Sequence, residues 1–140
     1  MTGKGGTQTN LFDRCGGFAV VRRIVTLFYD KVLESPLVAR HFAGVDMPRL
    51  IDHQTKFLAS LMGGPASISD DALRRAHARL GITMEEFREV GELLRESLEE
   101  FGLHPADVAH LYNAFTSYAP LIVTREADAA DGVGDQVCCQ

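Results

Sequence analysis

The chain has 140 residues, of which 46% are hydrophobic and 24% charged, the balance of a single globular domain. Its 14 basic residues are scattered and outnumbered by 19 acidic ones, which argues against a nucleic-acid partner. No apolar run approaches the roughly 18 residues of a membrane span, and residues 1–10 lack the apolar centre of a secretory signal. We therefore expect a cytoplasmic protein with no membrane partner.

The three cysteines predict free thiols. Cys15 lies near the start, and Cys138 and Cys139 are adjacent at the end, so no disulfide framework follows from this odd number. A vicinal pair can bind soft metals or undergo oxidation, but without a third ligand nearby we interpret it as part of a flexible tail.

The chain divides into one domain and two tails. Residues 1–10 and 125–140 are rich in Gly, Thr, Asp and Ala without an apolar period, so we expect them to be flexible. Over residues 11–124, apolar residues recur at helical spacing and no segment alternates with period two. The predicted fold class is all-α.

Start and stop signals divide the first half of this domain into helices. Gly16-Gly17 should end a short opening helix, and the next helix should run to about Ser35. Residues 37–42 form a predicted short helical piece after Ser35-Pro36. A further helix should begin at Pro48 and end at Gly63-Gly64-Pro65.

The second half contains three predicted helices. Ser69 should cap a short helix that runs through Leu80 and ends at Gly81. Residues 83–86 match a capping box, which should open a long helix ending before Gly102. The last helix should run from residue 105 to 122 with a kink at Pro120.

Two histidines fall on apolar helix faces. His53 and Gln54 interrupt the stripe of the helix that begins at Pro48, and His77 shares a face with Leu73 and Leu80. From spacing alone, His77 is either a core histidine bonded to a backbone carbonyl or an axial haem ligand. His53 is either a solvent-facing residue or part of the same site. Nucleotide-binding, zinc and hydrolase motifs are absent.

The order and spacing of six segments resemble the truncated haemoglobins, most closely their first group, the two-on-two helical globins. The segments are LFDRCGGF, LFYDKVLESP, HFAGVDMPRL, HQTKFLASLMGGP, RRAHARLGIT and MEEF, and the resemblance covers residues 11 to about 123. It implies haem b as cofactor. His77 would be the proximal iron ligand, and Tyr29 and Gln54 would donate hydrogen bonds to a bound gas, with the ring of Phe28 beside the haem.

The resemblance also suggests roles for polar residues at the edge of the site. Some relatives use a histidine at the position of His53 as a second iron ligand, whereas others have a lysine that pairs with a propionate, so both roles stay open. Arg49 is either a propionate partner or a solvated arginine, and Arg79 has a similar, weaker claim. The remaining residues expected to pack on the haem are apolar: Phe42, Leu50, Phe57, Leu73, Ile82 and Phe87.

The resemblance implies reversible binding of dioxygen or nitric oxide, with carbon monoxide as a further ligand, by a protein that we expect to be monomeric. An enzymatic role could follow: dioxygenation of nitric oxide to nitrate with an external reductase, or a peroxidase-like activity. The alternatives are a carrier, store or sensor of gas without turnover, and a haem-free helical interaction protein.

Overall fold

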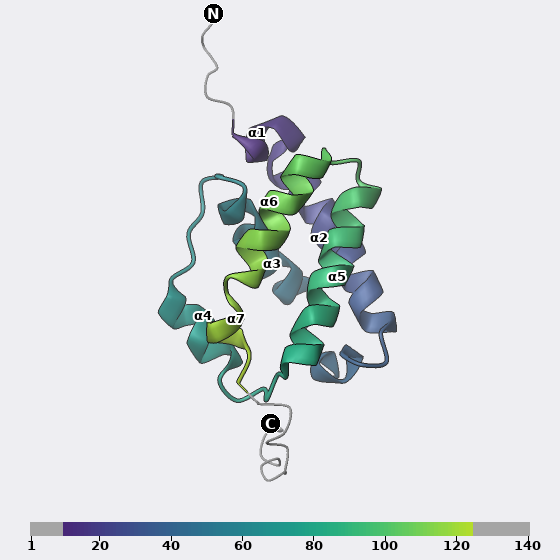
Figure 1. Ribbon diagram of the computed structural model, residues 1–140, viewed down its shortest axis with the longest axis vertical. Coiled ribbons are helices and arrows are strands. Elements are labelled where there is room, and N and C mark those ends of the chain that lie inside the picture. The colour runs from purple at the N-terminus through teal and green to yellow at the C-terminus, as the bar shows by residue number, and fades with distance from the viewer. Residues whose placement is uncertain (1–9, 125–140) are drawn as a thin grey trace, which may run out of the picture.

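The computed structural model describes residues 10–124, which form an all-helical domain without β-strands (Figure 1). This confirms the predicted fold class. The elements in chain order are α1 (Leu11–Cys15), α2 (Gly17–Glu34), the 3-10 helix η1 (Ala39–Phe42), α3 (Met47–Leu61), α4 (Asp70–His77), α5 (Met84–Glu100), α6 (Pro105–Thr116) and α7 (Ala119–Ile122). Within the described range, no helix is both long and apolar enough to cross a membrane.

Capping side chains begin these helices as the sequence predicts. Ser69 accepts a hydrogen bond from the backbone N–H of Ala72 at the start of α4. Thr83 and Glu86 form both hydrogen bonds of a capping box at the start of α5. Each cap satisfies backbone donors that the first helical turn leaves without partners.

The first helix holds the end of α3 in place. Asn10, which the sequence assigned to the N-terminal tail, caps α1, and its Nδ2 donates to the carbonyl of Gly63 over 2.7 Å. The N–H of Phe12 donates to the carbonyl of Met62 over 3.0 Å. The predicted tails otherwise fall on residues 1–9 and 125–140, outside the described residues, as do Cys138 and Cys139.

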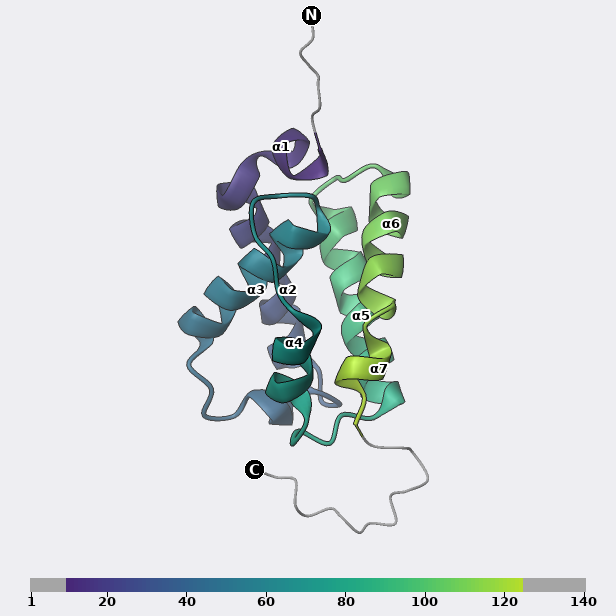
Figure 2. The same cartoon turned by 90° about the vertical axis from the view of Figure 1, so that its left-hand side faces the viewer.

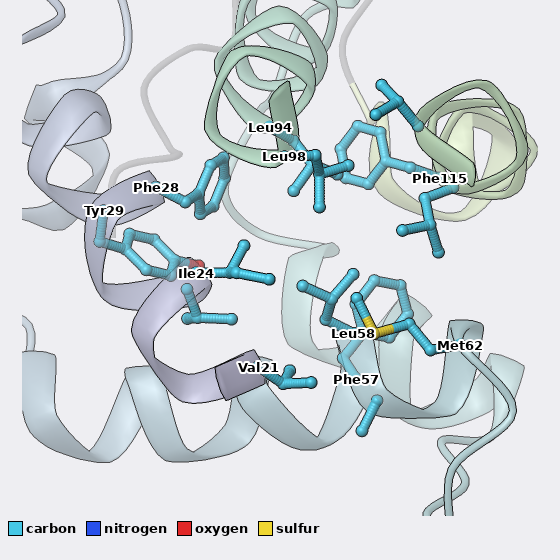
Figure 3. Close-up of a cluster of buried hydrophobic side chains, with 14 of the residues drawn as sticks. Val21, Ile24, Phe28, Tyr29, Phe57, Leu58, Met62, Leu94, Leu98 and Phe115 are labelled. Atoms are coloured by element: carbon cyan, nitrogen blue, oxygen red, sulfur yellow. The ribbon is translucent and has the colours of Figure 1, made fainter. Parts of the chain in front are cut away.

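The helices pack into two layers around one core. The closest packing joins α2 to α3, α2 to α5, and α5 to α6, while α4 has its main contacts with α7. Figure 2 shows α4 and α7 side by side. Buried side chains from every α-helix form a single hydrophobic cluster, part of which is drawn in Figure 3. Cys15 lies partly buried at its edge.

Three predicted boundaries were wrong. α4 ends at His77 rather than Leu80, because a turn from residue 78 leads to Gly81 at φ +63°. The predicted last helix is two helices, since Pro120 has no N–H and its ring crowds the carbonyl four residues earlier, so α6 ends at Thr116. Of residues 37–42, only Ala39–Phe42 are helical, as a 3-10 turn.

Candidate functional site

His77 is the last residue of α4 and presents one ring nitrogen without a partner. Its Nδ1 lies 2.8 Å from the carbonyl oxygen of Leu73, one turn earlier in the same helix. A neutral imidazole that donates from Nδ1 leaves the Nε2 lone pair available to a metal. Nε2 makes no hydrogen bond to another described residue, and the side chain is half-buried. The local geometry therefore suits an axial ligand.

Tyr29 of α2 is a buried phenol surrounded by aromatic rings. The residue is 6% exposed, and its ring meets those of Phe28 and Phe42 edge-on, at centroid distances of 4.7 and 5.6 Å. Figure 3 shows Phe28 and Tyr29 extending from α2 toward the buried cluster. Burial raises the pKa of the Tyr29 hydroxyl well above its usual value, so the group stays protonated and can donate.

The hydroxyl of Tyr29 makes no hydrogen bond to another residue of the range 10–124. It is not among the fully buried polar atoms that lack a partner, so the oxygen keeps some accessible surface. A ligand with an acceptor atom would give this donor the partner that the described residues do not supply. Tyr29 therefore points to a bound molecule with an acceptor atom.

Gln54 and His53 lie on α3, the helix that packs most closely on α2. The side chain of Gln54 is partly buried and free of hydrogen bonds to other described residues, so its amide is available as a second donor. His53 is exposed. From that position the imidazole would have to move inward to ligate a metal, so this role stays a prediction.

The apolar residues expected at the site all belong to the core or pack against it. Phe57 and Phe87 are buried and meet other rings: Phe57 lies edge-on to Tyr118 at 5.4 Å, and Phe87 stacks on Phe115 at 4.8 Å. Leu73 is buried as well, whereas three others are partly buried: Phe42, Leu50 and Ile82. These residues offer the apolar side chains on which a flat organic ring can pack.

The two arginines at the expected edge are exposed. The side chains of Arg49 and Arg79 form no ion pair with another described residue, and only the backbone N–H of Arg49 is engaged, donating to Asp46 over 3.2 Å. Both guanidinium groups are thus accessible to a carboxylate. A solvated role and a propionate role both remain consistent with this position.

The structure adds two residues that sequence analysis did not single out. Tyr118 packs on Phe57, and His41 of η1 lies against Glu86 of α5. The signal for Tyr118 was its place three residues after Phe115, on the inward face of the last predicted helix. His41 carried no such signal, because its partner is 45 residues away in the chain and the pairing depends on packing.

These residues fit a haem better than a bare metal ion. Among residues 10–124, no three His, Cys, Asp or Glu side chains gather closely enough to hold an ion. One imidazole with a free Nε2 and apolar rings are the groups that hold a haem, since the porphyrin supplies the other ligands of the iron, and a phenol without a partner can donate to a bound ligand.

Comparisons with known proteins agree with this geometry. A sequence profile of the bacterial-like globin family matches residues 10–123. The chain is 34% identical to "Group 1 truncated hemoglobin GlbN" of a Synechocystis species over 105 residues, which are 72% of this chain and 84% of that protein. It is 31% identical to the group 1 truncated hemoglobin of Tetrahymena thermophila over 96 residues, which are 69% of this chain and 79% of that protein.

Solved structures show the same fold. The 2/2 hemoglobin of Synechococcus sp. PCC 7002, solved in the cyanomet state with covalently attached heme, superposes with a TM-score of 0.77 and 27% identity, covering 84% of this chain and all of that one. Chlamydomonas reinhardtii THB1 gives a TM-score of 0.70 and 30% identity over 84% of this chain and 98% of that one. The chain therefore belongs to the bacterial-like globin family, as a group 1 truncated haemoglobin, a class of haem proteins that bind small gaseous ligands.

Proposed function

We propose that His77 of α4 would hold a haem b through its Nε2, and that Tyr29 of α2 and Gln54 of α3 would donate hydrogen bonds to a gas bound there. The observation that carries this proposal is the hydrogen bond of His77 Nδ1 to the Leu73 carbonyl, which fixes the ring and frees Nε2. When bound, the haem supplies a ferrous iron that takes up a diatomic gas. The residues of the chain would orient the gas, donate hydrogen bonds to it and exclude water.

Tyr29 and Gln54 would act on the gas as hydrogen-bond donors. The Tyr29 hydroxyl stays protonated because it is buried, and no other described residue competes for its proton. A hydrogen bond to a polarised ligand is stronger than one between neutral groups, typically about 1.5–3 kcal/mol. The two donors should therefore retain dioxygen more strongly than apolar carbon monoxide.

We further propose that the protein dioxygenates nitric oxide. Dioxygen, nitric oxide and one electron combine to give nitrate, and a reductase would supply the electron. Retention of dioxygen by Tyr29 and Gln54 supports this role, because the oxygen must remain in place until nitric oxide arrives.

The test combines oxygen binding with product analysis. The reduced, haem-reconstituted protein should bind dioxygen reversibly and should form one nitrate per protein when its oxygenated form is mixed with nitric oxide. Sustained nitrate formation should appear only after an electron donor is added. Reversible oxygen binding with no nitrate would instead make the protein a carrier or store, and failure to bind dioxygen or carbon monoxide would contradict both roles.

A further inference from the structure

The 3-10 helix η1 depends on its side chains for its position. It has only four residues, and such a short 3-10 segment gains little stability from its own hydrogen bonds. It nevertheless carries Phe42, whose ring meets the ring of Tyr29 edge-on at 5.6 Å. Whatever holds η1 in place therefore also holds the ring against Tyr29.

That anchor is the carboxylate of Glu86 at the start of α5. Glu86 is 4% exposed, and its Oε1 accepts the backbone N–H of Thr83 over 3.0 Å. The other oxygen, Oε2, accepts a hydrogen bond from the guanidinium of Arg40. Burial by itself would raise the pKa of Glu86, but the Thr83 N–H, His41 and Arg40 together lower the pKa below its usual value. The carboxylate is therefore ionised and fixed relative to α5.

His41 is the second tether. Its Nε2 is buried and lies 3.1 Å from Oε1 of Glu86, at an angle outside that of a good hydrogen bond, with no other partner in the described part of the chain. With a hydrogen on Nε2 the ring is attracted to the carboxylate at this distance, whereas a lone pair there would be repelled. Just after the end of α2, the Oγ of Ser35 donates a hydrogen bond to Oε2 of Glu89 over 2.8 Å.

His41 and Glu86 each precede an aromatic residue of the candidate site in the chain. Phe42 follows His41 in the chain, and Phe87 follows Glu86 and stacks on Phe115. One buried carboxylate thus joins the two segments that bring Phe42 and Phe87 to the site. A shift of this carboxylate would move Phe42 relative to Tyr29 and would leave Tyr29 itself unchanged.

We propose that Glu86, with Arg40 and His41, positions the Tyr29 hydroxyl by holding Phe42 against its ring, and so sets the hydrogen bond that Tyr29 gives to a bound gas. This rests on the proposed function of Tyr29. None of the three residues would touch the gas or the haem. They are positioning residues, and their effect must pass through Tyr29.

The experiment measures two properties of the haem-reconstituted protein in parallel: the C–O stretching frequency of the reduced carbon monoxide complex, and the rate of oxygen dissociation. The variants are Glu86→Gln, which can still form a capping box, and His41→Phe, which keeps an aromatic ring. We expect each variant to raise the C–O frequency and to speed oxygen release about three- to tenfold, as a weakened hydrogen bond requires. Glu85→Gln is the matched control, because it removes an exposed carboxylate from the same helical turn.

Repeating both substitutions in a Tyr29→Phe background separates positioning from general damage. With the hydroxyl gone, Glu86→Gln and His41→Phe should change oxygen release less than twofold. Unchanged spectra and rates in the wild-type background, or equal effects with and without the hydroxyl, would overturn the inference. If Glu86→Gln fails to fold, His41→Phe carries the same comparison. Failure of the wild type to take up haem would instead overturn the proposed function, and this inference with it.

Discussion

Tyr29 is the residue whose role depends most on what surrounds it. Its side chain is buried, and its hydroxyl is protonated and makes no hydrogen bond to another residue of the described range. We predict that Tyr29→Phe speeds oxygen dissociation about tenfold or more, since tenfold corresponds to about 1.4 kcal/mol and a hydrogen bond to a polarised ligand contributes at least that. Stopped-flow measurement of oxygen release checks this. Tyr118→Phe removes the hydroxyl of a partly buried tyrosine and should leave the rate of oxygen release within twofold. An effect equal to that of Tyr29→Phe would contradict the assignment of Tyr29.

His53 is exposed, which favours a role at the edge of the site. We predict that optical spectra of the reduced protein without added gas show the same high-spin iron in the wild type and in His53→Ala. Sharp low-spin α and β bands in the wild type that disappear in the variant would show instead that His53 swings inward and ligates the iron. The neighbouring Lys56→Ala, also exposed on α3, is the matched control.

Candidate site residues could be named from the sequence, and their roles stay predictions, but the contacts that they make could not be predicted. The RRAHARLGIT segment singled out His77 as a haem ligand through resemblance, whereas spacing alone favoured a core histidine. Its bond to Leu73 and the unpartnered hydroxyl of Tyr29 depend on which atoms meet after folding. The contact of His41 with Glu86 joins elements far apart in the chain, so no local pattern contains it.

At the scale of elements, helix starts were easier to predict than helix ends. Ser69 and Thr83 act as caps through hydrogen bonds to the next few residues, so their effect is written in the local sequence. The end of α4 at His77 and the break before α7 depend on how the chain turns back onto its neighbours. A pattern of apolar residues continues through such a turn and cannot mark it.

The turn after α3 rests against α1 at Gly64. A Cβ added at Gly64 would lie 2.7 Å from two ring carbons of Phe12 and 3.1 Å from the carbonyl oxygen of Ala59. We predict that Gly64→Ala lowers the free energy of unfolding by about 1–3 kcal/mol through overpacking, as measured by urea denaturation. Phe12→Leu should reduce this penalty in the double variant.

Gly102 provides the contrast for that experiment. Its φ is +82° and a Cβ there meets nothing within 4 Å, so Gly102→Ala introduces backbone strain without a clash. Its cost should be about 1–2 kcal/mol and should be the same with Phe12 or Leu at position 12. An equal penalty for Gly64→Ala in both backgrounds would contradict the proposed clash.

The capping box of α5 should make stability depend on pH. The pKa of Glu86 is lowered in the folded protein, so its stabilising contribution is complete above the ordinary glutamate value of 4.5 and is lost as the pH falls through the lowered value. We predict that Glu86→Gln is less stable than the wild type at pH 7 and that the difference shrinks below pH 4.5. Thermal melts followed by circular dichroism check this. A difference that does not change with pH, or one matched by Glu85→Gln, would contradict it.

At the scale of the whole molecule, one core serves both folding and the site. Ile24, Leu98 and Leu111 are fully buried at its centre, while Tyr29, Phe57 and Leu73 belong to the same cluster at the site. A ligand that binds only the folded state adds to its stability in proportion to the logarithm of the ligand concentration. Haem binding and folding should therefore be coupled in this protein.

Ligation of the haem by His77 is tested by the optical spectrum of the haem-reconstituted protein, compared for the wild type, His77→Gly and His110→Ala. The wild type and His110→Ala, which changes an exposed histidine on α6, should show the same strong Soret band. His77→Gly should lose the spectrum of a histidine-ligated ferrous haem and recover it when imidazole is added to fill the space left by the side chain. An unchanged His77→Gly spectrum would contradict the assignment of His77 as the proximal ligand.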